Sequence, residues 1–113
     1  MELSEIARLI DNKELQKAQN ELIKLGEKYH KNPEYLFLRG RIFYLSKLYY
    51  LSIDILFIAL EFGQSDKIYN LLSDIYKVLE NEELRKKTLD KNLRFSAIQE
   101  IKDQMSGIYR KKI

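Results

Sequence analysis

Apolar residues recur at every third or fourth position along nearly the whole chain, mostly separated by Lys, Glu, Asp and Asn. This spacing places the apolar side chains on one face of an α-helix. Only four Gly and one Pro interrupt the pattern, which favours long helices over a strand-and-turn fold. We therefore predict seven helices and no strand. They span about residues 3–10, 13–29, 33–45, 47–62, 65–79, 82–94 and 97–110.

Short polar signals mark the ends of these helices. The sharpest is Asn32-Pro33, because Asn caps a helix well and Pro suits the first helical position. Asn12 is predicted to cap the second helix and Asn81 the sixth. Gly63 follows the fourth helix and is a suitable residue for its C-terminal end.

The boundary between the last two helices depends on one local motif. The run Ser96-Ala97-Ile98-Gln99 matches a capping box, which predicts a separate last helix. One long helix is the alternative, because nothing between Glu82 and Ser106 forbids it. The apolar stripe of the last helix is predicted to comprise Ile98, Ile101, Met105 and Ile108.

The two central helices carry a recognisable pattern. Leu36-x2-Arg39-Gly40-x2-Phe43 is followed by Ser52-x3-Leu56-x2-Ala59-Leu60, and together they resemble one tetratricopeptide repeat (TPR). Arg39 stands where the family favours Leu, and Gln64 where it favours Pro. The pattern recurs on both sides: Ala18-x3-Leu22-x2-Leu25 lies 34 residues before the second half, and Tyr69-x2-Leu72-Ser73-x2-Tyr76 lies 33 residues after the first.

This resemblance implies an all-α fold in which antiparallel helix pairs stack as a short right-handed TPR-like solenoid. It implies a single domain over residues 1–113, with repeats at about 1–31, 32–65 and 66–95 and a capping helix at about 96–111. The third repeat is degenerate, because Lys86 stands 34 residues after Ser52, where a small residue is expected. Terminal repeats are commonly atypical. Neighbouring helices are expected to touch at the small residues Ala18, Gly40, Ser52 and Ala59.

In the TPR family the first helix of each pair lines a concave surface, which implies where a partner binds here. Residues at spacing i, i+4 and i+7 on the third and fifth helices then face a shared groove. An aromatic, an arginine and mixed polar groups are typical of a peptide groove. The family's residues for gripping a C-terminal carboxylate are not matched, because Phe37 and Asp74 are unsuitable. The predicted groove residues are Phe37, Arg41, Tyr44, Asn70, Asp74 and Lys77.

The fourth helix is apolar over much of its circumference. Tyr49, Ile53, Leu56 and Leu60 lie close together on one side and suffice to pack the repeat. A second row lies roughly opposite and is a possible interface for a homodimer or a stable partner, because contiguous apolar patches usually mark interfaces. The alternative is that other helices of this chain cover it. The row consists of Leu51, Ile55, Ile58 and Phe62.

Charge is distributed unevenly along the chain. Residues 1–81 hold 11 Lys and Arg against 12 Asp and Glu, whereas residues 82–113 hold 9 against 5, for a total of +3. This basic third suggests an alternative function as a nucleic-acid or anionic-surface binder. A solvated face is favoured, because Phe95 and Tyr109 are its only aromatic residues. The residues used for such binding would be Arg85, Lys86, Lys87, Lys91, Arg94, Arg110, Lys111 and Lys112.

The sequence contains little that resembles a catalytic or metal site. There is no Cys and His30 is the only histidine, so a metal centre is not expected. Asp54 belongs to the one polar strip of its helix, and no Gly-rich phosphate loop is present. We therefore expect no enzymatic activity and no cofactor.

The remaining patterns bear on location and function. The start of the chain has no basic stretch followed by an apolar one, so a signal peptide is not expected. The most apolar run, Leu48–Leu60, spans 13 residues, short of the roughly 20 that cross a bilayer. We expect a cytoplasmic, non-enzymatic protein–protein interaction module acting as an adaptor, assembly factor or chaperone-like scaffold.

Overall fold

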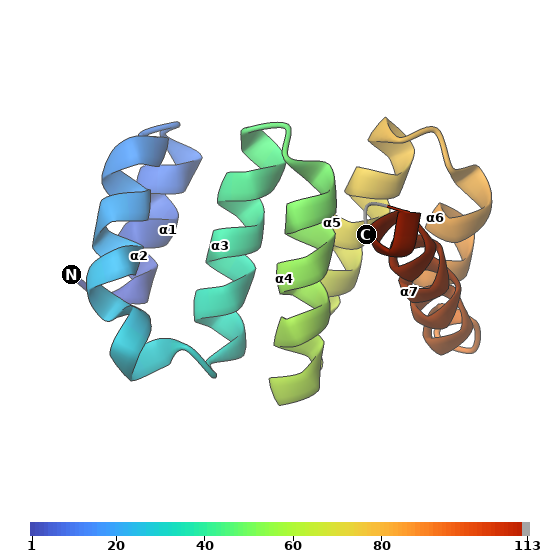
Figure 1. Cartoon of the computed structure of the whole chain (residues 1–113). Helices are drawn as coiled ribbons and strands as arrows, with labels where there is room; N and C mark the ends of the chain where they lie inside the picture. Colours follow the sequence, from blue (N-terminus) through green and yellow to red (C-terminus); the bar gives the residue numbers. More distant parts are fainter. Residues whose placement is uncertain (112–113) are drawn as a thin grey trace. The chain divides into compact units, whose positions relative to one another are not determined.

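A computed structural model describes residues 1–111 of the chain, with side chains described for residues 1–105. The described part is all-helical, as the apolar spacing predicts, and contains seven helices and no strand (Figure 1). No helix in it is both long and apolar enough to cross a membrane. The helices are α1 (Leu3–Asp11), α2 (Leu15–Tyr29), α3 (Pro33–Leu45), α4 (Tyr49–Phe62), α5 (Asp66–Val78), α6 (Glu82–Leu89) and α7 (Arg94–Lys111).

The residues group into two compact units. The first, Met1–Ile68, contains α1 to α4 and the first turn of α5; the second begins at Tyr69 and contains the rest of α5 with α6 and α7. In the first unit α3 is the central helix, because it contacts α1, α2 and α4. Helices α1 and α2 lie side by side, as do α3 and α4 (Figure 1). The most deeply buried side chains of this unit include Ile6, Ile10, Ala18, Leu22, Leu38, Ile53, Leu56 and Ala59.

Small residues bring α3 and α4 into close contact. Gly40 of α3 is buried, and a Cβ atom at this position would lie only 2.7 Å from Cδ2 of Leu56. Ser52 of α4 donates a hydrogen bond of 2.7 Å from its Oγ to the carbonyl oxygen of Gly40. Ser52 is fully buried, and so are Ala18 and Ala59. All four residues expected at helix contacts therefore lie in the interior.

One turn geometry occurs three times within residues 1–111. The backbone is left-handed at Lys13, Lys47 and Glu80, with φ of 63°, 63° and 58°. These residues are spaced 34 and 33 positions apart. In each turn the next residue donates its N–H to the carbonyl five positions earlier, as Leu48 does to Phe43 over 2.8 Å. This bond is characteristic of the Schellman motif that ends many helices. The period seen in the sequence thus recurs in the backbone.

These turns explain two errors in the predicted helix starts. Asn12 was expected to cap the second helix, but it is the C-cap of α1, and Glu14 precedes α2 instead. The fourth helix likewise begins at Tyr49 rather than Lys47. A Schellman turn uses about two residues beyond the helix end, so the following helix begins later.

The start of α3 lies next to the end of α4 within the first unit. The Asn32 side-chain oxygen accepts hydrogen bonds from the N–H groups of Glu34 and Tyr35, at 2.9 and 3.1 Å, which confirms the predicted cap. Gly63 follows α4 as predicted, but its φ of 177° is extended rather than left-handed. A Cβ atom there would lie 2.9 Å from Cγ of Pro33. A side chain at Gly63 would therefore disturb the close packing against Pro33, and it would not strain the backbone.

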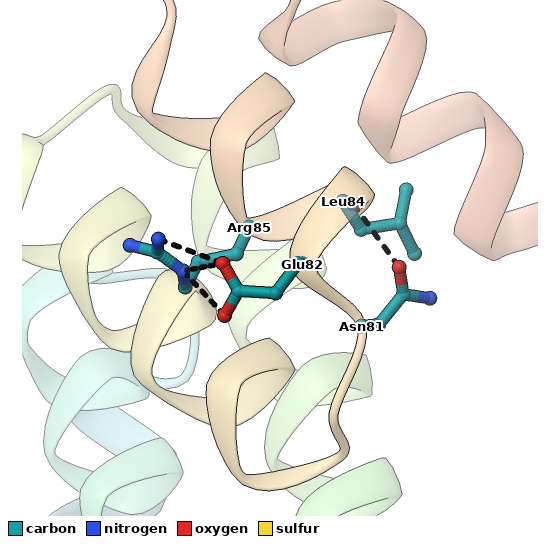
Figure 2. Close-up of polar contacts among 4 residues, drawn as sticks. All are labelled: Asn81, Glu82, Leu84 and Arg85. Atoms are coloured by element: carbon teal, nitrogen blue, oxygen red, sulfur yellow. Dashed lines mark hydrogen bonds and ion pairs between the residues drawn. The ribbon is translucent and has the colours of Figure 1, made fainter.

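In the second unit, α6 and α7 are separate helices. Asn81 caps α6 by accepting the N–H of Leu84 at 3.1 Å, and Arg85 pairs with Glu82 in the first turn (Figure 2). Helix α6 ends at Leu89, five residues earlier than expected, because Asp90 starts a turn in which its side chain accepts the N–H of Asn92.

Helix α7 begins at Arg94, so Ser96 lies inside its first turn and not before it. The carbonyl of Asp90 accepts the N–H groups of both Leu93 and Arg94, which starts the helix earlier than the capping-box pattern suggests. Of the predicted apolar stripe, Ile101 and Met105 are buried and Ile98 is half-buried. The side chain of Ile108 lies outside the described residues.

Candidate functional site

Three predicted groove residues form a strip along one face of α3. Phe37, Arg41 and Tyr44 are all half-buried. The Arg41 guanidinium donates to the Asp11 carboxylate, at the end of α1, over 2.9 Å. Tyr44 contacts the Tyr49 ring edge-on, with centroids 6.0 Å apart. The strip therefore combines a phenylalanine, an arginine paired with α1 and a tyrosine that contacts α4.

The other three predicted groove residues lie on α5. Asn70, Asp74 and Lys77 are exposed, and their spacing places them on one helical face. They belong to the second compact unit, whereas the α3 strip belongs to the first. A groove that combines both sets remains a prediction.

The second apolar row of α4 is largely accessible. The exposed fractions of Leu51, Ile58 and Phe62 are 48%, 42% and 44%. Ile55 differs, because it is buried and its Cγ2 would lie 3.3 Å from a Cβ atom at Gly40. The row available to a partner thus consists of Leu51, Ile58 and Phe62, and Ile55 belongs to the contact between α3 and α4.

A pocket of about 290 Å³ lies between α2 and α3. Arg39 is half-buried in its wall, and its guanidinium carbon lies 6.0 Å from the ring centroids of both Tyr35 and Phe43. The sequence contains one signal for this site: Arg39 interrupts an apolar stripe where the TPR pattern favours Leu. The lining residues are Gln19, Leu22, Ile23, Tyr35, Arg39, Ile42 and Phe43.

The basic residues of the C-terminal third are partly neutralised within the chain. Arg85 makes a bidentate pair with Glu82, in which its Nη2 lies 2.8 Å from the carboxylate (Figure 2). The guanidinium of Arg94 stacks on the ring of Tyr69 at 3.9 Å. Lys86 and Lys91 are exposed. Arg110, Lys111 and Lys112 lie outside the residues whose side chains are described. A continuous basic surface is therefore not favoured among the described residues.

An ion pair links α6 to α7 in the second unit. The Lys87 ammonium lies 3.0 Å from the Glu83 carboxylate and 3.2 Å from that of Glu100 on α7. These two hydrogen bonds raise the pKa of Lys87. Tyr76 on α5 is almost fully buried, and this burial, with the negative charge of Glu100, raises the pKa of its hydroxyl. The charges of α6 and α7 are thus paired, and burial favours the neutral form of the Tyr76 phenol.

The residues considered for chemistry lie apart from any cluster. His30 is exposed at the C-terminal end of α2, where its Nδ1 lies 3.1 Å from the carbonyl oxygen of Glu27. Asp54 is half-buried on α4. Within the described residues, no three His, Cys, Asp or Glu side chains gather closely enough to hold a metal ion. No protein-family model, curated protein or solved structure matches this chain.

Proposed function

We propose that this chain is a cytoplasmic, non-enzymatic protein–protein interaction module. Its helix pairs would stack antiparallel as a short right-handed TPR-like solenoid closed by α7. The concave groove of this solenoid would bind a peptide or helix of a partner protein. The half-buried strip of Phe37, Arg41 and Tyr44 on α3 is the observation that carries the proposal.

The strip has the properties of an interaction surface. Aromatic residues and arginine dominate binding energy at interfaces, and half-buried side chains still gain by further burial. The ion pair with Asp11 uses Nη2 of Arg41, and the planar guanidinium has further N–H donors that could bind a partner. The repeated turns and the contact between Gly40 and Ser52 support the stacking of like helix pairs.

Removing the strip is expected to abolish partner capture without unfolding the chain. Arg41→Ala combined with Tyr44→Ala deletes two side chains of hot-spot type, and each truncation is expected to weaken binding by about 1–2 kcal/mol. The fold is spared, because an exposed ion pair contributes at most about 1 kcal/mol. Affinity capture from cell extract followed by mass spectrometry would compare the double variant with the wild type.

A matched control is the pair Arg8→Ala and Tyr50→Ala, which removes an exposed arginine and an exposed tyrosine elsewhere in the same unit. Partners captured by the wild type and by this control, but not by the Arg41/Tyr44 variant, would support the groove. Equal capture by all three would place binding on another surface.

Self-association through α4 is a second candidate function. It is favoured by the exposure of Leu51, Ile58 and Phe62, which lie along one side of a single helix. Large apolar side chains that are exposed together commonly mark an interface. Two copies could bury this row by placing their α4 helices against each other.

We expect the wild type to show a mass that rises with concentration in analytical ultracentrifugation. Replacing Leu51 and Ile58 together with Glu should yield a folded monomer of higher solubility, because four charges per dimer cannot be buried unpaired. Circular dichroism would verify the fold. The candidate is refuted by a wild type that stays monomeric at high concentration, or by a double variant that unfolds.

A further inference from the structure

The Arg39 side chain has a charge that the described part of the chain leaves unpaired. Among residues 1–105 its guanidinium forms no ion pair and no hydrogen bond. Its contacts are with aromatic rings: the guanidinium lies between Tyr35 and Phe43, one helical turn to either side on α3. Rings attract the cation but leave its five N–H donors without acceptors. Arg41 and Arg85, by contrast, each pair with a carboxylate.

The pocket around Arg39 has an apolar floor and an open rim. Leu22, Tyr35 and Ile42 are buried at its base. At the rim, Ile23 is unusually exposed, with 67% of its surface accessible, and Gln19 offers an amide group. A volume of about 290 Å³ lies at the lower end of ligand pockets and is suited to one or two amino-acid side chains.

The unpaired guanidinium and the apolar floor together favour one class of ligand. A planar guanidinium held by rings matches a carboxylate, which it binds through two parallel hydrogen bonds. The apolar floor requires an aliphatic group next to that carboxylate. Nucleobase stacking is disfavoured, because Tyr35 is buried and Phe43, the other ring that lines the pocket, is half-buried. A phosphate-rich ligand is also disfavoured, because Arg39 is the only basic residue that lines the pocket.

We propose that the pocket between α2 and α3 is a docking site for a partner polypeptide that presents an acidic side chain next to a bulky aliphatic one. The acidic group pairs with Arg39, and the aliphatic group covers Leu22 and Ile23. This site is distinct from the strip containing Arg41. Residues two positions apart in a helix lie about 160° apart around its axis, so the two arginines point to nearly opposite sides of α3.

The blocked tripeptide acetyl-Leu-Glu-Leu-amide is a direct probe of this pocket. Added to the full chain, it is expected to cause saturable NMR shifts of the Arg39 Nε–H and of the Leu22 and Ile42 methyl groups. The matched peptide with Gln in place of Glu should bind at least about 10-fold more weakly, because it loses a charge-assisted pair. Arg39→Gln should weaken binding of the Glu peptide to the same extent.

Two further variants test the shape of the Arg39 side chain and provide a control outside the pocket. Arg39→Lys retains the charge but not the planar fork, so binding should weaken several-fold while the chain stays folded. Arg8→Gln removes an exposed arginine of α1, outside the pocket, and should leave binding unchanged. Three results would each overturn the proposal: no saturable shift, equal affinity for the Glu and Gln peptides, or tighter binding of inorganic phosphate than of the Glu peptide.

Discussion

Replacing Gly40 with leucine is expected to lower the free energy of unfolding of the first unit by about 1–3 kcal/mol. Any side chain at this position meets Leu56, whose Cδ2 and Cγ atoms lie 2.7 and 3.0 Å from the point that a Cβ atom would occupy. Leu56 is fully buried, and Cγ2 of Ile55 also lies only 3.3 Å from the same point. The extra atoms must therefore separate α3 from α4, which also stretches the hydrogen bond from Ser52. Urea denaturation followed by circular dichroism measures the loss.

A double-mutant cycle tests whether Leu56 causes this cost. Gly40→Ala alone adds one methyl group against Leu56 and should be destabilising despite the higher helix propensity of alanine. Leu56→Ala alone creates a cavity and should cost about 2–5 kcal/mol. In the Leu56→Ala background, Gly40→Ala should instead stabilise by up to about 1 kcal/mol, because only the propensity gain remains. If the effects of the two substitutions were additive, the close contact between Gly40 and Leu56 would not be the cause of the lost stability.

The second unit is expected to lose stability in alkali through Tyr76. Burial and the charge of Glu100 raise the pKa of its hydroxyl in the folded state above the ordinary value of 10.0. Folding thus favours the neutral form of Tyr76. Its favourable contribution to the stability of the second unit is complete below pH 10 and is lost as pH rises above 10. The free energy of unfolding should therefore fall as pH rises above about 10, by at most about 1.4 kcal/mol for each pH unit.

Tyr76→Phe should remove this alkaline loss, because phenylalanine has no proton to release. At about pH 11.5 the wild type should have lost more stability than the variant, by up to roughly 2 kcal/mol relative to pH 8. Denaturant titrations at both pH values, monitored on the second unit, provide the comparison. The control Tyr50→Phe alters a half-exposed tyrosine of α4 and should follow the wild type. Parallel losses in the wild type and Tyr76→Phe would contradict the prediction.

Local signals in the sequence predict the helices well, and their ends less well. Asn32-Pro33 and Asn81 are correct predictions, because a cap depends on the side chain and on backbone groups two or three residues away. The turns at Lys13 and Lys47 are missed, because the usual signal for a left-handed residue is Gly or Asn, and here it is Lys. The early start of α7 depends on a turn around Asp90 that competes with the capping-box pattern at Ser96.

Surface features depend on packing that the sequence does not encode locally. Helical spacing places Ile55 in the same row as Leu51 and Ile58, yet only Ile55 is buried, because it lies next to Gly40 on the facing helix. Arg39 is visible in the sequence as a departure from an apolar pattern. The pocket around Arg39 is not visible in the sequence, because the shape of the pocket depends on how α2 and α3 pack. The rings that flank Arg39, by contrast, follow from their spacing of four residues.

The way α3 contacts its neighbours has a consequence for how fast the first unit folds. Its helix pairs involve only adjacent or next-but-one helices, and turns of three residues join α1 to α2 and α3 to α4. Closing short loops costs little entropy, and such topologies reach the native state within microseconds to milliseconds. The apolar side chains that fold into the core, such as Ile53 and Leu56 of α4, are then exposed only briefly to other unfolded chains, which leaves little time for aggregation during synthesis.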